Sequence, residues 1–194
     1  MHAIRQPAFV AAVIAAALVP SVSFAQDELE RNGFVLGAWA GYGAMKLNTR
    51  YPAAASSSSG TLAMGIKVGY ALGTRVTAGV EANGWTLHAY DNTDPTRGEA
   101  LSNASLFANY FPLETLPLFF EAGGGETTYI NNAPAVSAHD TGSQRFVGAG
   151  YEYALSGGFF LVPQVRYARG DFGGGNFRVW EAALGVTWYS GRVR

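Results

Sequence analysis

The feature that most constrains this chain is a two-residue alternation between apolar side chains and small or polar ones. Between Gly60 and Leu72, the even positions from 62 onward read Leu, Met, Ile, Val, Tyr and Leu, and the odd positions read Thr, Ala, Gly, Lys, Gly and Ala. Successive side chains of a β-strand point to opposite faces, so a period of two predicts a strand rather than an amphipathic helix. One face of this strand is apolar along its whole length.

The same alternation recurs in seven other segments, which makes eight expected strands. These segments cover residues 34–42, 76–83, 103–110, 119–125, 146–153, 161–167 and 180–189. The last is the clearest, because every even position from Trp180 to Trp188 is apolar. Phe107 and Phe119 are exceptions, since they fall on faces that are otherwise small or polar.

The connections between these strands alternate between short and long. Residues 73–74, 112–117 and 156–158 are tight turns, whereas 49–59, 91–98, 131–142 and 170–176 are longer and polar. Short turns at one end and long loops at the other are typical of an outer-membrane barrel, with its turns in the periplasm and its loops outside the cell. The pattern predicts one barrel domain without an internal linker.

Composition excludes several classes of function. The 194 residues carry a formal net charge of −1, which offers no basic surface for nucleic acid. Cysteine is absent, so the chain has no disulfide, thiolate metal site or cysteine nucleophile. Only 14% of the residues are charged, whereas soluble domains average about 25%. A low charge content is compatible with a surface that faces lipid.

The first 25 residues resemble a cleavable signal peptide. His2 and Arg5 precede an apolar run over residues 9–19, and Ser23-Phe24-Ala25 has the small-residue pattern of a cleavage site. The run is shorter than the roughly 20 residues that span a bilayer as a helix. We therefore expect residues 1–25 to be removed and residues 26–194 to form the barrel, inserted through strands.

The polarity of the two faces separates a membrane barrel from a soluble one. Lipocalin-like and streptavidin-like barrels also close about eight strands, but their apolar side chains point inward. Here the face opposite the apolar one carries Gly, Asn, Lys and Glu, which suits a narrow lumen. Aromatic residues near the strand ends fit the girdles expected at membrane interfaces: Tyr42, Tyr70, Tyr110, Tyr151, Trp180 and Trp188. The predicted fold is all-β, an eight-stranded antiparallel up-and-down transmembrane β-barrel.

Hairpin register predicts which lumen residues are neighbours. In an antiparallel hairpin, the numbers of two opposed residues add up to a constant that the turn sets. A turn centred on residues 73–74 brings Lys67 nearly opposite Glu81. A turn centred on Thr115 places Asn109 across from Glu121.

The same argument extends to the last two strands. A centre between Gly173 and Gly174 pairs Arg166 with Glu181, and the count also brings Glu121 beside Glu152. We expect a lumen network closed by ion pairs, with more carboxylates than bases: Lys67, Glu81, Asn109, Glu121, Glu152, Gln164, Arg166 and Glu181. Lone buried charges would cost several kcal/mol each. The alternative is that these residues line a wet channel.

Four segments carry a resemblance to a known family. They are the opening strand GFVLGAWAGYG (33–43), FANYFP (107–112), GAGYEY (148–153) and the closing ALGVTWY (183–189). With them the chain resembles the small outer-membrane β-barrel superfamily that includes the OmpA transmembrane domain, OmpX and the opacity-type surface proteins. The resemblance implies a location in the cell outer membrane, contact with its lipid and lipopolysaccharide, insertion by the barrel-assembly machinery, and an extracellular partner bound through the loops. Family members usually end on an aromatic residue, whereas this chain continues over residues 190–194.

Some eight-stranded outer-membrane barrels modify lipid A, so catalytic residues must be considered. Ser137, His139 and Asp140 share one predicted loop, and His88 is near Asp91 and Asp94. A triad needs a nucleophile, a base and an orienting acid in fixed geometry, which neighbours in a polar loop rarely achieve. The glycine triplets at 123–125 and 173–175 lack the Lys-Ser/Thr of a phosphate-binding loop. We expect no catalytic, cofactor or metal site.

The sequence therefore favours a non-enzymatic barrel with a structural or surface-interaction role. About eight strands leave an interior just wide enough for side chains, which argues against transport. Two alternatives stay open. One is a lipid A-modifying hydrolase or acyltransferase, and the other is OmpW-like passage of small hydrophobic compounds, which needs an apolar lumen that opens sideways between strands.

Overall fold

The strands observed extend those predicted from the alternation. The computed structural model describes residues 31–50, 59–89, 98–133 and 136–191, so the predicted signal peptide lies outside the described residues. The strands are β1 (Gly33–Thr49), β2 (Ser59–Ala71), β3 (Val76–Ala89), β4 (Gly98–Tyr110), β5 (Leu118–Ala133), β6 (Val136–Tyr151), β7 (Tyr153–Ala154), β8 (Phe159–Phe172) and β9 (Gly175–Tyr189). No helix of the described ranges is long and apolar enough to cross a membrane.

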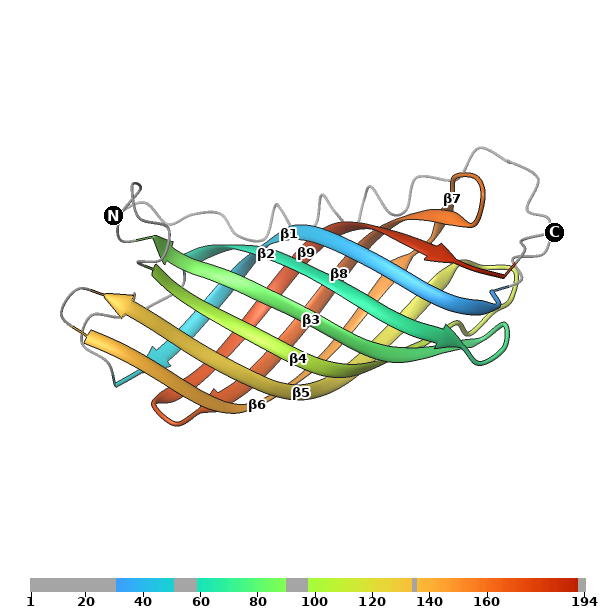
Figure 1. Cartoon of the computed structure of the whole chain (residues 1–194). Helices are drawn as coiled ribbons and strands as arrows, with labels where there is room; N and C mark the ends of the chain where they lie inside the picture. Colours follow the sequence, from blue (N-terminus) through green and yellow to red (C-terminus); the bar gives the residue numbers. More distant parts are fainter. Residues whose placement is uncertain (1–30, 51–58, 90–97, 134–135, 192–194) are drawn as a thin grey trace.

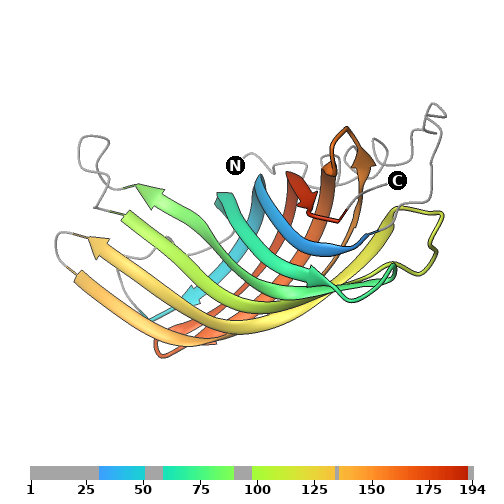
Figure 2. The same cartoon turned by 45° about the vertical axis from the view of Figure 1, so that its right-hand side comes forward.

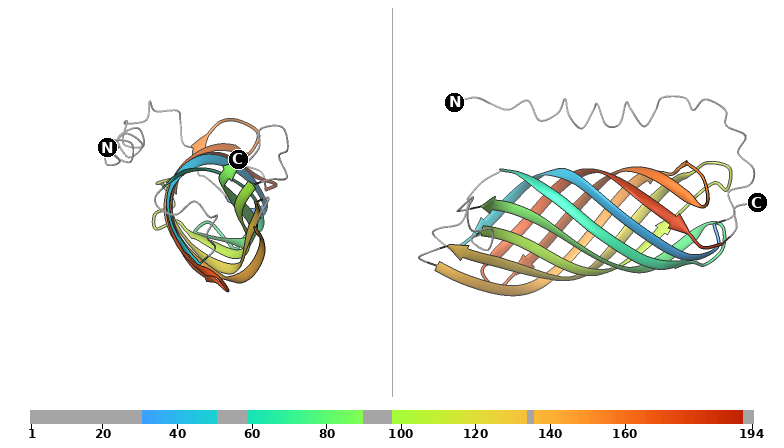
Figure 3. Two further views of the ribbon diagram at one scale, coloured as in Figure 1. Left: turned by 90° about the vertical axis from the view of Figure 1, so that its left-hand side faces the viewer. Right: turned by 45° about the horizontal axis from the view of Figure 1, so that its top comes forward.

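These strands close into one antiparallel barrel (Figure 1). The order β6-β5-β4-β3-β2-β1-β9-β8 returns on itself because β6 also pairs with β8. The two-residue β7 continues β6 after an interruption at Glu152 and pairs with β8, so the barrel has eight strands. Figure 2 shows the tilt and curvature of the strands, and the left view of Figure 3 shows the closed ring nearly end-on. The predicted fold class is confirmed.

The three short turns occur where they were predicted, but two of the four long loops do not exist. β5 continues to Ala133 and β6 begins at Val136, so most of the predicted loop 131–142 is strand. Likewise β8 reaches Phe172 and β9 starts at Gly175, which leaves two residues of the predicted loop 170–176 as a connection. Backbone hydrogen bonds between strands do not require apolar side chains, so a strand can continue through polar residues beyond the apolar belt. The polar ends of β5, β6, β8 and β9 therefore resemble loops in the sequence. The other two predicted loops fall largely on residues 51–58 and 90–97, outside the described residues.

The outer face of the barrel is apolar over its middle. Many large apolar side chains are exposed there, including Phe34, Leu36, Leu62, Met64, Ile66, Val68, Val80, Leu106, Phe120, Val147, Leu184 and Val186. The six aromatics predicted for the girdles also lie on this face. Four of them are about half exposed (Tyr42, Tyr70, Tyr110 and Trp180), and Tyr151 and Trp188 are partly exposed. The predicted direction of the apolar face is therefore confirmed.

Glycines on the inner face make room for large side chains that cross the lumen. A Cβ atom added at Gly65 would collide with the indole ring of Trp39. One added at Gly123 would collide with the ring of Phe146. The interior of so narrow a barrel is filled by alternating small and large side chains, which explains why this face is rich in glycine.

Candidate functional site

All eight residues of the predicted lumen network are buried inside the barrel. They come from six strands and from the interruption after β6, and each is at most 6% exposed: Lys67, Glu81, Asn109, Glu121, Glu152, Gln164, Arg166 and Glu181. The three predicted cross-strand pairs are observed, with Lys67 opposite Glu81, Asn109 opposite Glu121 and Arg166 opposite Glu181. The predicted register is therefore correct at these three hairpins.

The ion pairs nevertheless do not follow the register. Arg166 donates from Nη1 and Nη2 to the two carboxylate oxygens of Glu81, at 2.9 and 3.0 Å. Its Nη2 also donates to Oε1 of Glu121, at 2.6 Å. The predicted ion pair between Arg166 and Glu181 is wrong, because the guanidinium fork reaches across the lumen to a carboxylate that it can bind with two parallel bonds.

Lys67 also pairs across the lumen. Its Nζ lies 3.8 Å from Oε2 of Glu121, and its ion pair is with this residue and not with its register neighbour Glu81. Glu121 thus connects both cations, and Lys67, Arg166, Glu81 and Glu121 form one buried cluster. We call these four residues the charged cluster.

Glu181 belongs to the same layer but is held by two tryptophans. Nε1 of Trp39 donates to Oε1 at 3.2 Å, and Nε1 of Trp85 donates to Oε2 at 2.8 Å. This arrangement was not among the predicted lumen contacts. The sequence does indicate that both tryptophans point into the lumen. Trp39 and Trp85 occupy odd positions on β1 and β3, as do the inward residues Gly37 and Glu81 of the same strands.

Aromatic rings contact both cations of the charged cluster. The guanidinium carbon of Arg166 lies 4.9 Å from the Trp39 ring centroid and 4.4 Å from that of Phe146. Nζ of Lys67 lies 5.4 Å from the centroid of Phe107 and 5.7 Å from that of Phe119. The two phenylalanines that broke the sequence pattern are therefore cation–π partners inside the lumen.

The layer around the charged cluster is polar and incompletely paired within the protein. Several buried side-chain atoms have no hydrogen-bond partner among the described residues: Oδ1 of Asn83, Asn103 and Asn109, Oε1 of Gln144, Nε2 of Gln164 and Nε of Arg166. Buried polar groups of this kind are normally satisfied by ordered water. These atoms could therefore bind ordered water beside the ion pairs.

Glu152 does not lie beside Glu121, as the register count predicted. The residue opposite Glu121 is Gly148, because β5 ends at Ala133 and β6 begins at Val136, which places the centre of the hairpin two positions before the midpoint of the predicted loop. A turn two positions earlier shifts the pairing by four residues. Glu152 instead binds Arg31, with Nε 2.8 Å from Oε2, and accepts a bond of 2.6 Å from the Tyr189 hydroxyl.

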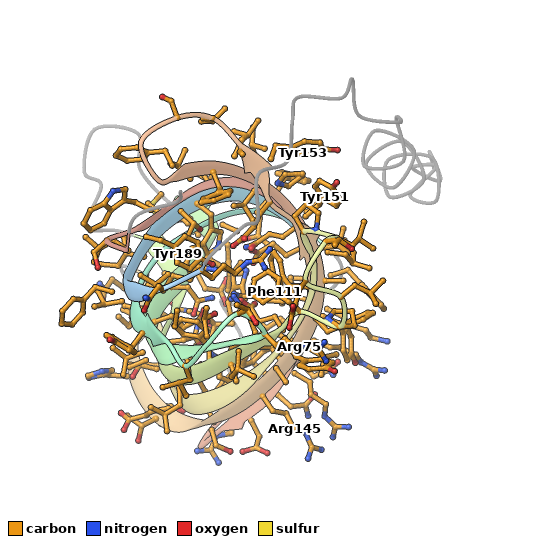
Figure 4. The ribbon with its side chains drawn as sticks, turned by 90° about the vertical axis from the view of Figure 1, so that its right-hand side faces the viewer. Arg75, Phe111, Arg145, Tyr151, Tyr153 and Tyr189 are labelled. Atoms are coloured by element: carbon orange, nitrogen blue, oxygen red, sulfur yellow. The ribbon has the colours of Figure 1, made fainter. Side chains whose placement is uncertain are left out.

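This second group lies at the end of the barrel that carries the short turns. The guanidinium carbon of Arg31 lies 3.5 Å from the centroid of Phe111, and Nη1 donates to the carbonyl of Thr74 at 3.4 Å. Figure 4 shows Phe111 and Tyr189 within the ring of strands. We call Arg31, Glu152, Tyr189 and Phe111 the turn-end cluster. No sequence pattern pointed to Arg31, which precedes the first strand.

The opposite end of the lumen is packed with aromatic side chains. The Tyr129 and Phe172 rings stack with centroids 4.7 Å apart, and the Tyr129 hydroxyl donates to Glu99 at 2.6 Å. Trp85 packs against Phe177 with centroids 5.7 Å apart. The charged cluster therefore lies between two packed layers.

Among the described side chains, His139 and Asp140 do not form the arrangement that a triad would need. His139 lies within β6 and is exposed, and Asp140 follows it directly, so the two side chains point to opposite faces of the strand. His88 lies in β3 opposite Glu99, and Asp91 and Asp94 fall outside the described residues. No group of three or more candidate metal ligands occurs within the described part of the chain.

Comparison with known proteins places this architecture among small outer-membrane barrels. The neisserial surface protein NspA superposes with a TM-score of 0.61 at 19% identity, over 81% of this chain and 97% of that chain. The N-terminal β-barrel domain of Pseudomonas aeruginosa OprF gives a TM-score of 0.49 at 16% identity, over 82% of this chain and 98% of that chain. No protein-family profile and no curated protein matches the sequence. The likeness confirms the resemblance in fold.

Proposed function

We propose that this protein is an integral outer-membrane barrel with a structural and surface-contact role, whose lumen is closed to solutes by its own side chains. The observation that carries the proposal is the pairing of Arg166 with Glu81. β3 and β8 are four strands apart in either direction around the barrel, so this pair spans the full diameter of the lumen. NspA, which shares the fold, is itself named a surface protein.

The outer face supports placement in a membrane. In β9 the nine residues from Trp180 to Trp188 have an aromatic side chain at each end and apolar residues at every outward position between them. A tilted transmembrane strand needs about 9–11 residues to cross the hydrocarbon core. The closed hydrogen-bond ladder leaves no backbone edge exposed to lipid.

The interior supports closure. Side chains from β2, β3, β5 and β8 meet in the charged cluster, and the tryptophans of β1 and β3 meet Glu181 of β9 beside it. The aromatic layer around Tyr129 and the turn-end cluster narrow the lumen on either side of the charged cluster. Side-chain filling of this kind is normal for barrels of about eight strands.

Planar-bilayer conductance tests closure directly. We expect the purified protein to show no sustained conductance, and the double variant Glu81→Gly with Arg166→Gly to open a measurable ion pathway. Arg169→Gly is the matched control, because Arg169 lies on the same strand but on the outer face. If the unmodified protein conducts ions as well as the double variant does, the protein is a channel and the proposed closure is wrong.

Membrane insertion and orientation have their own tests. A closed barrel is expected to migrate differently before and after boiling in detergent electrophoresis, because heating opens its ladder. Epitope tags inserted within residues 51–58 and 90–97 are expected to be accessible on intact cells, since the ends with longer loops face outward in this class. Equal mobility, full solubility without detergent or a protected tag would contradict this placement.

We also propose that the protein has no catalytic role. His139 lies on a different strand face from Asp140, which disfavours a lipid A deacylase or acyltransferase built on these two residues. Mass spectrometry of lipid A from cells with and without the gene is expected to show the same acylation. A difference that depends on His88 or His139 would support an enzyme instead.

A further inference from the structure

A row of four basic residues crosses the outer wall of the barrel. Lys46 of β1 is directly opposite Arg178 of β9, Arg178 is opposite Arg169 of β8, and Arg169 is opposite Arg145 of β6. All four side chains are exposed. Figure 4 shows Arg145 outside the ring of strands. We call these residues the basic row.

The basic row is unfavourable for the isolated barrel. Like charges directly opposite one another on adjacent strands destabilise a sheet. Asp171 lies two residues from Arg169 on the same face, and Glu126 of β5 lies opposite Ser143, two residues from Arg145. Neither forms an ion pair with the row, and no acidic residue in the described part of the chain does. Three successive repulsive pairs indicate an external anion.

The basic row lies just beyond the apolar belt, on the side of the longer connections. Trp180 and Tyr167 are cross-strand partners with ring centroids 4.8 Å apart. Tyr167 is two residues before Arg169 on β8, and Trp180 is two residues after Arg178 on the antiparallel β9, so both rings lie on the same side of the row. Two strand residues correspond to about 7 Å. Because interfacial aromatics mark the edge of the hydrocarbon, the row falls at the depth of the lipid headgroups.

Three of the four residues also line a hollow on this wall. It has a volume of about 570 Å³, and its lining includes Arg145, Arg169, Arg178, Tyr167 and Asp171. Guanidinium groups bind phosphate with two parallel hydrogen bonds, so three of them in one concavity suit a phosphorylated ligand. By register the row continues from Arg145 to Gly124 of β5, Leu106 of β4 and Val80 of β3, none of them charged, so the feature is confined to one wall.

We propose that the basic row binds the phosphate groups of lipid A in the outer leaflet. Charge complementarity and depth select this occupant, because the row meets anions at the headgroup level and Trp180 and Tyr167 lie beside the acyl chains below it. The inference rests on the proposed membrane placement, with the longer connections facing outward.

Binding of purified lipid A to the protein in nanodiscs of zwitterionic lipid tests the inference. We expect bisphosphorylated lipid A to bind, and its dephosphorylated form to bind much more weakly. The triple variant Arg145→Gln, Arg169→Gln and Arg178→Gln is expected to lose about a hundred-fold in affinity, from the attraction that each cation contributes near anionic lipid. Arg75→Gln is the control, since Arg75 is an exposed cation at the turn end.

Each outcome is decisive. Equal binding by the triple variant and the unmodified protein, or no preference for the phosphorylated lipid, would overturn the inference. So would binding of a sulfated oligosaccharide through the row without binding of lipid A. If the protein fails to insert into the nanodisc, the proposed membrane placement is wrong. If it inserts, keeps its native electrophoretic mobility and shows no preference for phosphorylated lipid A, the proposed function stands and only the proposal that the basic row binds lipid A is wrong.

Discussion

Arg166 and Arg169 lie three residues apart on β8, yet their surroundings are opposite. Arg166 faces the lumen, is 2% exposed, and binds two carboxylates while contacting two aromatic rings. Arg169 faces outward, is exposed, and has an arginine on either side. The parity of the position decides this difference. An even residue on this strand must find its counter-charge inside the protein, whereas an odd one is free to bind an external anion.

The comparison also predicts opposite effects on stability. Inside the lumen, each charge of the charged cluster is buried and depends on a partner, so loss of the partner leaves a buried charge uncompensated. On the outer wall, solvent and salt screen the charges, and removal of one relieves repulsion. Substitutions on the two faces should therefore change stability in opposite directions.

The largest effect is expected for Glu121→Gln. This change leaves Lys67 without its carboxylate and Arg166 with only Glu81, so we expect a loss of about 3–5 kcal/mol in the free energy of unfolding. Urea unfolding in detergent micelles measures it. Glu126→Gln is the matched control, because Glu126 lies on the same strand but faces outward, and it should change stability by less than about 0.5 kcal/mol.

A second substitution sharpens this result. Adding Lys67→Met to Glu121→Gln removes the cation that was left unpaired, so part of the lost stability should return. If Glu121→Gln and Glu126→Gln have the same free energy of unfolding, the charged cluster does not stabilise the barrel, and the predicted difference between the two faces is wrong.

An intermediate effect is expected for Trp85→Phe. The phenylalanine keeps much of the packing against Phe177 but removes the 2.8 Å hydrogen bond to Glu181. Loss of a buried bond to a charged group costs about 1.5–3 kcal/mol. Unfolding of Trp180→Phe, on the outer face, provides the comparison and should be nearly unaffected in micelles. Similar losses for both tryptophans would mean that the hydrogen bond between Trp85 and Glu181 does not account for the effect.

The smallest effect, and the one of opposite sign, is expected for Arg169→Gln. In micelles without lipopolysaccharide it should stabilise the barrel by about 0.2–1 kcal/mol, because it removes two like-charge cross-strand contacts. The gain should shrink as salt rises from low ionic strength to about 0.5 M, where screening is strong. A destabilised variant would show that Arg169 has an internal partner.

The register of the lumen residues could be predicted at each hairpin whose turn could be located in the sequence. Lys67 and Glu81 flank a tight turn, and Asn109 and Glu121 flank a turn bounded by prolines, so both pairs were placed correctly. Glu152 was misplaced because a polar strand end over residues 136–142 resembled a loop. Arg31 could not be predicted, since its position depends on the closure of the whole barrel.

The sequence by itself determined which face of each strand meets lipid and which meets the lumen, because side-chain alternation is a local property of the extended backbone. It also determined the class of fold, since eight such faces without a helical span leave closure of the sheet as the way to satisfy the backbone in lipid. Only the tertiary structure decided that Arg166 binds Glu81 across the lumen and that Glu181 is held by Trp39 and Trp85. These contacts join strands far apart around the ring, and their distances are set by barrel diameter and strand stagger, which no single hairpin contains.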